Sequence, residues 1–169
     1  MGRTTDFRLY PFDPRRVEAS GKFVGHHIYW KLYLLENIFR IIINSVLSVQ
    51  IGPDWWDVAV DDKIRKRAVK FKKDYLRRPW YTKPGSHDIY YIYLRDLSEI
   101  MRANSNLFLP VIPDIDSWIA RVEQILLPRN IVGHMNFPSE TDQKRIDVFY
   151  SDSKILLTTL QTSLLLQVP

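Results

Sequence analysis

Apolar residues recur every three or four positions along most of this chain, whereas the strict alternation typical of a β-strand is scarce. The clearest stripe precedes Gly52 and Pro53 and consists of Ile28, Leu32, Leu35, Phe39, Ile42 and Val46. This spacing predicts a helix of roughly twenty residues or more, because residues three and four apart share one helix face. Gly52 and Pro53 interrupt helices, so we expect this helix to end there.

The same pattern predicts two further helices in the middle of the chain. Asp54 can cap a helix that begins at Trp55 and Trp56 and continues through Phe71. Residues 77–88 contain Pro79, Pro84 and Gly85 and are expected to form a loop. Ser86 or Asp88 is expected to cap the next helix, which carries the apolar positions Ile92, Leu94, Leu97, Ile100 and Met101.

Two more helices are predicted before the chain ends. One begins near Asp114, and its apolar stripe continues at the same spacing to Arg129. Ser139 is expected to cap the last helix, with Asp142 three residues further on as a weak capping box. The chain therefore predicts an all-α fold, a bundle of about five helices. No repeat or composition shift divides it, so we expect one helical domain over residues 21–166, preceded by an N-terminal arm over 1–20.

The composition supports a folded domain and excludes several kinds of site. Hydrophobic residues make up 46% of 169 residues, which is enough for a core, and the absence of cysteine excludes disulfides and thiolate metal sites. Phosphate-loop, GxSxG and HExxH motifs are missing, so we expect neither a cofactor nor a metal. The longest apolar run is broken by Asn44 and Ser45, and the first residues lack a signal-peptide block, so we expect a cytoplasmic protein without a membrane partner.

Positive charge is concentrated in one segment. The chain carries a net charge of +5, and residues 63–83 hold ten Lys or Arg against the single acid Asp74. Such a stripe commonly faces a polyanion, although a solvated helix face is the alternative. The residues expected to bind RNA are Lys63, Arg65, Lys66, Arg67, Lys70 and Lys73. Trp80 and Tyr81 beside them suit either stacking on RNA bases or packing against the core.

A group of polar residues interrupts the apolar pattern in LLPRNIVGHMN, residues 126–136. Arg129 falls where the stripe places a core residue, so it needs a carboxylate, a phosphate or a partner subunit. Asn130 and His134 are four residues apart and share a helix face. These residues are either a helix-terminal arginine and a hydrogen-bonded core histidine or a catalytic group. Glu36 and Arg40 form an i,i+4 pair, which is either an exposed ion pair or an acid that orients an active-site cation.

RNIVGH at 129–134 resembles the R-x4-H motif of HEPN domains, the higher eukaryote and prokaryote nucleotide-binding all-α domains. LLENIFRIIINSVL, with Glu36 and Arg40, resembles the first long helix of that family. IGPDWWDVAVDDKIRKRAVKFKK resembles an aromatic-then-basic segment of some subgroups, and IYYIYLRDLSEIM resembles the helix that follows it. The resemblance covers about residues 25–160.

This resemblance implies a metal-independent endoribonuclease, of toxin or antiphage-defence type, in which a homodimer brings two motifs into one cleft. Arg129 would bind the scissile phosphate, and His134 would act as general acid or base for attack by the ribose 2′-hydroxyl. Asn130 would bind the phosphate or hold the imidazole. The expected partners are RNA and a second copy of the chain, and a cognate antitoxin or a larger defence-system protein is a further candidate.

Two positions depart from the family pattern. Asn136 stands where some toxin-type members carry a tyrosine, so regulation through that tyrosine is not expected. Pro128 directly before the arginine is unusual for a site in the middle of a helix, and we expect it to kink the turn that precedes it.

Three hypotheses follow, in this order. The first is a dimeric HEPN ribonuclease. The second is a non-catalytic RNA-binding or dimerisation module with the same fold. The third is a helical nucleic-acid-binding scaffold that binds through Lys66, Arg67 and Lys70 and in which His134 has only a structural role.

Overall fold

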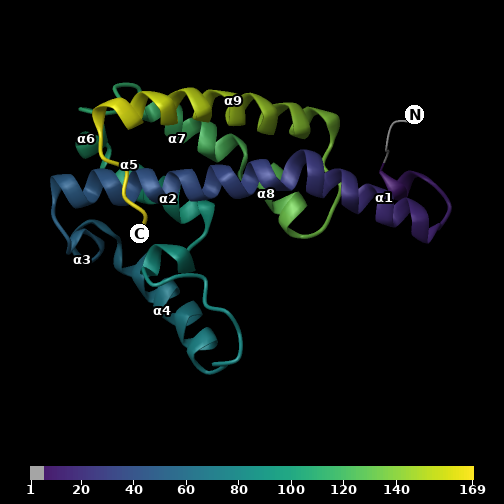
Figure 1. Cartoon of the computed structure of the whole chain (residues 1–169), viewed down its shortest axis with the longest axis horizontal. Coiled ribbons are helices and arrows are strands. Elements are labelled where there is room, and N and C mark those ends of the chain that lie inside the picture. Colours follow the sequence, from purple (N-terminus) through teal and green to yellow (C-terminus); the bar gives the residue numbers. More distant parts are fainter. Residues whose placement is uncertain (1–5) are drawn as a thin grey trace.

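The computed structural model describes residues 6–169, and within that range it contains helices and no strand, which confirms the all-α prediction. A single long rod runs through the molecule (Figure 1). It consists of α1 (Pro14–Val24), a π-helical turn η2 (Gly25–Tyr29) and α2 (Trp30–Gln50). A short 3-10 turn, η1 (Phe7–Leu9), precedes it. Residues 14–20 of the expected arm therefore form the first turns of this rod, and residues 1–5 lie outside the described part.

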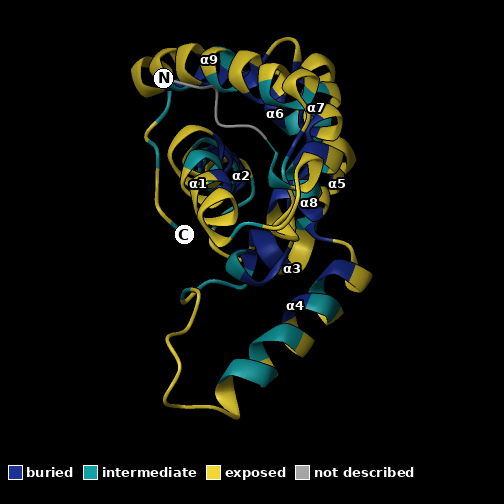
Figure 2. Ribbon diagram, turned by 90° about the vertical axis from the view of Figure 1, so that its right-hand side faces the viewer, coloured by how far each residue is buried: buried dark blue, intermediate teal, exposed yellow. Residues whose placement is uncertain are grey.

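The remaining helices follow α2 along the chain. They are α3 (Trp55–Ala59), α4 (Asp62–Leu76), α5 (Leu94–Ala103), α6 (Ser105–Phe108), α7 (Ile115–Gln124), α8 (Leu126–Gly133) and α9 (Glu140–Ser163), with a 3-10 turn η3 (Asp88–Tyr91) before α5. Helix α2 contacts α3, α5, α6 and α9, and its side chains Leu35, Phe39 and Ile42 are completely buried. Helix α4 projects away from this bundle (Figures 1 and 2).

Several helix boundaries differ from the sequence prediction. The helix expected from Trp55 to Phe71 is two helices, because Val60 is extended and Asp61 caps α4 by accepting a hydrogen bond from the Lys63 N–H. The Asp54 side chain makes no capping bond. His87, rather than Ser86 or Asp88, caps the turn η3, and α5 begins only at Leu94. The cap by Ser139 is confirmed, since its Oγ accepts the Asp142 N–H at 3.1 Å.

The helix expected to continue from Asp114 to Arg129 is also divided. Helix α7 ends at Gln124, and α8 begins at Leu126 after Ile125 leaves ideal helical geometry with ψ −1°. Pro128 is therefore the third residue of α8, where its missing N–H removes no hydrogen bond within the helix. The sequence predicted a kink in the turn before Pro128, and the break at Ile125 lies in that turn.

The rod Pro14–Gln50 is long and apolar enough to cross a membrane by length and composition, which the interrupted apolar run did not suggest. Of its most apolar window, 56% is buried inside the structure. The core helix of a bundle passes the same test, so the finding is weak evidence for a membrane span.

Asn44 and Ser45, which interrupt the apolar run in α2, have partners in the tertiary structure. Asn44 accepts a hydrogen bond from Trp55 Nε1 at 3.1 Å and donates to the Gln167 carbonyl at 3.1 Å. The Gln167 N–H donates to Ser45 Oγ at 2.7 Å. The segment 164–169 thus returns across α2 after α9 and is fixed there (Figure 1).

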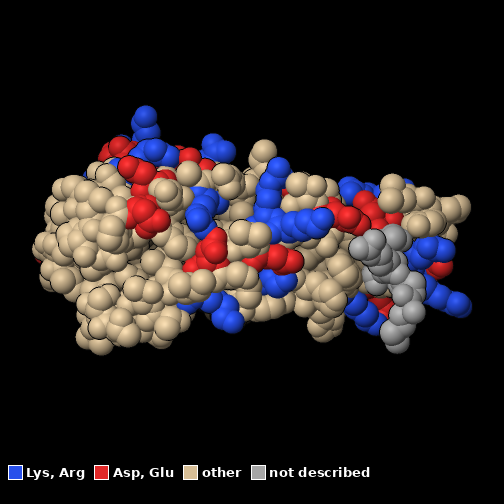
Figure 3. Space-filling model, turned by 90° about the horizontal axis from the view of Figure 1, so that it is seen from above, with Lys and Arg blue, Asp and Glu red and all other residues tan. Residues whose placement is uncertain are grey.

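Charged side chains of both signs are mixed along the middle of the face that α9 covers, and one end of that face is uncharged (Figure 3). Residues 155–169, which include the end of α9, contain no charged side chain. This face therefore offers no continuous positive surface for a polyanion.

His87 makes stability depend on pH. Its ring stacks on Trp55 with centroids 5.2 Å apart, and its Nδ1 accepts the Ile89 N–H at 3.1 Å, which requires an unprotonated nitrogen. Burial lowers the pKa of His87 from its ordinary value of 6.5; Asp88 opposes this shift and Lys72 adds to it. His87 in the unfolded chain therefore binds a proton more readily than in the folded chain. The stability that neutral His87 contributes to the fold is complete above pH 6.5 and is lost as the pH falls below that value.

We expect the free energy of unfolding to fall between about pH 7.5 and about pH 5.5, and to fall less in His87→Asn, whose amide oxygen can keep the cap. Urea unfolding of both proteins at both pH values measures this difference. An equal loss in the two proteins would contradict it.

Candidate active site

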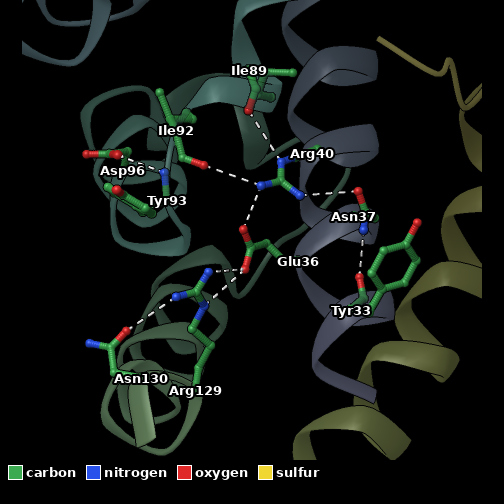
Figure 4. Close-up of polar contacts among 10 residues, drawn as sticks. All are labelled: Tyr33, Glu36, Asn37, Arg40, Ile89, Ile92, Tyr93, Asp96, Arg129 and Asn130. Atoms are coloured by element: carbon green, nitrogen blue, oxygen red, sulfur yellow. Dashed lines mark hydrogen bonds and ion pairs between the residues drawn. The ribbon is translucent and has the colours of Figure 1, made fainter. Parts of the chain in front are cut away.

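Glu36 and Arg129 meet across two helices (Figure 4). Glu36 lies in α2, and Arg129 is the fourth residue of α8. The Nε and Nη2 of Arg129 both donate to Glu36 Oε2 at 3.2 Å. The side chain of Arg129 is 27% exposed and that of Glu36 13% exposed. Arg129 therefore has the carboxylate partner that its position in the sequence required.

Arg40 holds the other oxygen of Glu36. Its Nη2 donates to Glu36 Oε1 at 2.6 Å, and the same guanidinium donates to the carbonyls of Ile89 and Ile92 at 3.3 Å. The Arg40 side chain is only 11% exposed, so this is not an exposed ion pair. Arg40 fixes Glu36 against the segment around η3, and Glu36 in turn orients Arg129 (Figure 4).

Asn130 and His134 lie at the surface beside this cluster. Asn130 is exposed, and its Oδ1 accepts from Arg129 Nη1 at 3.5 Å, the limit of a hydrogen bond. His134 is the exposed C-cap residue of α8, and its N–H donates to the Asn130 carbonyl at 2.9 Å. The interpretation of His134 as a core histidine is therefore wrong, and its imidazole is accessible from outside.

A cavity of about 660 Å³ opens beside Arg129. Helices α2 and α8 form two of its sides, and Pro84 and Val168 contribute from the loop before η3 and from the segment 164–169. Glu36, Arg40 and Arg129 are its charged groups. Gly133 and Met135, the two neighbours of His134, both line it, whereas the catalytic candidates Asn130 and His134 do not.

Three tyrosines line the cavity and were not among the predicted site residues: Tyr29, Tyr33 and Tyr90. Tyr33 is 63% and Tyr29 52% exposed, although both lie on a helix with a large buried face. The spacing carried a signal, since Tyr29 and Tyr33 are one turn apart, and a further turn reaches Asn37 beside Glu36. The sequence alone did not show that this face borders a cavity.

The turn after α8 has an unusual conformation. Met135 has φ 60°, the left-handed region that glycine favours, and the N–H groups of Met135 and Asn136 close the helix end onto the carbonyls of Val132 and Ile131. The Met135 side chain is 86% exposed and makes no compensating packing in the core. Gly133 lies against Arg129, because a Cβ there would be 3.4 Å from Arg129 Nη1. The strained residue therefore borders the cavity next to His134.

Met135→Gly is expected to raise the free energy of unfolding by about 1 kcal/mol, because glycine adopts this backbone conformation without the penalty that a Cβ imposes. Urea unfolding measures the change. Gly52→Ala is the matched control, since Gly52 also has positive φ, 114°, and must lose stability. A loss of stability in Met135→Gly would show that the side chain is needed there.

The basic residues predicted to bind RNA lie on α4 and divide into two groups. Arg67 pairs with the fully buried Asp96, Arg65 with Asp57 and Asp62, and Lys66 with Asp62. For Lys63, Lys70 and Lys73, no carboxylate within residues 6–169 lies at ion-pair distance. Arg67 anchors α4 to the start of α5, so its role is structural in this fold.

Helix α4 has its own groove, separate from the cavity beside Arg129. Its charged lining residues are of both signs: Arg65, Lys66, Lys70, Lys73 and Arg77 together with the acids Asp57, Asp62, Asp74 and Asp88. The structure therefore does not place the basic helix and the RNIVGH motif in one cavity, and the acids reduce the positive potential along the groove.

In the described range 6–169, no three His, Asp or Glu side chains are grouped so that they could hold a metal ion. Comparison of the chain with family models, with curated proteins and with solved structures gave no match. The geometry of the cluster and its cavity is therefore the basis for assigning a function.

Proposed function

We propose that this chain is a metal-independent endoribonuclease of the HEPN type that acts as a homodimer in the cytoplasm, as a toxin or defence effector. The observation that carries the proposal is Arg129, which lies on the wall of a cavity, is held there by the nearly buried Glu36 and precedes the exposed His134 by five residues. Arg129 offers fixed donors for a phosphate, and an accessible imidazole can serve as general acid or base.

The chemistry needs two proton transfers. The ribose 2′-oxygen attacks the phosphorus while one imidazole takes the 2′-hydroxyl proton, and the P–O5′ bond breaks while a second imidazole protonates the leaving oxygen. Arg129 stabilises the charge that develops on the non-bridging oxygens. A single chain supplies one His134, so a second copy that brings its own His134 to the same phosphate completes the pair. The products are a 2′,3′-cyclic phosphate and a free 5′-hydroxyl.

The test is cleavage of a mixed RNA pool in EDTA by the parent and by His134→Ala, together with sedimentation of the parent to determine whether it is a dimer. Cutting by the parent and loss of cutting in the variant support the proposal. Equal cutting by both proteins contradicts it.

A second candidate is a non-catalytic RNA-binding or dimerisation module. It is favoured by the contact of Arg129 Nε and Nη2 with Glu36, which occupies part of the guanidinium fork, and by the position of His134 outside the cavity wall. An RNA-binding dimer that never cuts RNA would support this candidate.

A further inference from the structure

The loop between α4 and η3 exposes two adjacent aromatic side chains. Trp80 is 75% exposed and Tyr81 is 60% exposed, and their ring centroids lie 6.3 Å apart. The sequence allowed packing of these rings against the core, and their exposure excludes it. Large aromatic rings left in water beside each other are typical of a binding surface.

The charges of this loop have one sign. Arg77, Arg78 and Lys83 flank the aromatic pair, and residues 75–87 contain no acid. Arg77 lies 3.9 Å from Asp74, which is a weak pair with a highly exposed arginine. For Arg78 and Lys83, no carboxylate within residues 6–169 lies at ion-pair distance. The loop therefore combines two π-faces with positive charge, unlike the groove of α4, where acids accompany the lysines.

The loop is attached firmly to the wall of the cavity that contains Arg129. Pro84 lines that cavity directly. Gly85 packs so closely on the Tyr90 ring that a Cβ would come within 2.3 Å of it, and the Tyr91 hydroxyl donates to the Gly85 carbonyl at 3.0 Å. Lys83 directly precedes Pro84, which lines the cavity, and Tyr81 lies two residues before Lys83 in the chain. Figure 2 shows the exposed loop returning from the end of α4 to the bundle.

We propose that Trp80 and Tyr81 stack on unpaired bases of a single-stranded RNA whose backbone continues past Lys83 to Arg129. The inference rests on the proposed function in that it takes RNA as the ligand of the cavity. Bases of a duplex are stacked on each other and offer no free face, so this surface selects single strands. A flexible strand can follow the path from the projecting loop into the cavity, whereas a flat membrane surface cannot enter it.

Binding of oligouridine, which lacks base-paired structure, tests the proposal on the His134→Ala background, where RNA is not cut. Trp55, Trp56 and Trp118 are buried and Trp30 is 40% exposed, so Trp80 is the most exposed tryptophan. Oligouridine is expected to quench tryptophan fluorescence, and Trp80→Phe is expected to lose most of the quenching while it keeps binding. In a fluorescence-polarisation assay, Trp80→Ala and Tyr81→Ala should each weaken binding roughly tenfold.

Phe12→Ala is the matched control, because Phe12 is an 86% exposed aromatic residue outside the loop and its removal should leave affinity unchanged. Unchanged affinity in the Trp80→Ala, Tyr81→Ala double variant would overturn the proposal, as would equal affinity for a duplex of the same length. Binding to phosphatidylserine vesicles without binding to oligouridine would also overturn it.

The two proposals can fail separately. A double variant that binds and cuts RNA like the parent overturns the role of the loop and leaves the ribonuclease intact. Loop-dependent binding of oligouridine by a parent protein that never cuts RNA supports the role of the loop and contradicts the ribonuclease.

Discussion

His134→Ala is expected to lower the rate of RNA cleavage in EDTA by about 10²–10⁴-fold, the range typical for loss of a general acid or base. His134 lies on the surface at the end of α8, and no side-chain hydrogen bond of its imidazole within residues 6–169 ties it to the fold. The variant should therefore keep the unfolding midpoint of the parent, so that lost activity reports lost chemistry. Gel analysis of a labelled RNA over time measures the rate.

The matched control is His26→Ala, because His26 is also exposed and lies in the turn η2. Its rate should equal that of the parent. Arg129→Ala should be as inactive as His134→Ala, since a phosphate without its guanidinium loses the fixed donors for its developing charge. If either Arg129→Ala or His134→Ala cut RNA at the parental rate, the ribonuclease proposal would be wrong.

Glu36→Ala is expected to lower the free energy of unfolding by about 3 kcal/mol, because it leaves two guanidiniums without their shared carboxylate. The larger cost comes from Arg40, whose side chain is 11% exposed and has little access to water. Arg129 is 27% exposed and can turn toward solvent, so it contributes less to the lost stability. Urea unfolding followed by circular dichroism measures the change.

Glu18→Ala provides the matched control for stability. Glu18 and Lys22 have the same i,i+4 spacing as Glu36 and Arg40, yet their side chains are 64% and 67% exposed. Loss of that exposed pair should cost far less stability than loss of Glu36, because water and salt screen the two charges. If the two variants lost equal stability, Glu36 would not hold the cluster together.

Glu36→Gln separates the effect of Glu36 on the stability of the fold from its effect on the orientation of Arg129. The amide keeps one acceptor oxygen but loses the charge that attracts both guanidiniums, so we expect a smaller loss of stability with a clear loss of cleavage. Cleavage at the parental rate in Glu36→Gln would show that the position of Arg129 does not depend on that charge.

The sequence determined the fold class because helical periodicity is a local property. The stripe from Ile28 to Val46 predicted α2, and its members are buried in the core. Local chemistry also predicted the cap of α9, since Ser139 needs only the N–H of Asp142 three residues away. Helix ends were harder to predict, because the breaks at Val60 and Ile125 leave the apolar spacing almost unchanged.

The candidate site was predicted in part. The sequence identified Arg129 as a misplaced charge that needs a partner, and it identified Glu36 and Arg40 as a pair. It could not connect them, because Glu36 and Arg129 are 93 positions apart and meet only when α8 packs beside α2. Nor could it separate Arg67, which is held by the buried Asp96, from Lys70 and Lys73 on the same helix, which have no carboxylate at ion-pair distance among residues 6–169.

By itself, then, the sequence determined which segments are helical, where positive charge gathers and which polar residues are out of place. Only the tertiary structure decided which of those residues meet, that Trp80 and Tyr81 are exposed, and that three tyrosines border a cavity beside Arg129. The physical reason is the range of the forces involved. Backbone hydrogen bonds and side-chain spacing act within a few residues, whereas burial and ion pairing depend on segments that are distant in the chain and adjacent only after folding.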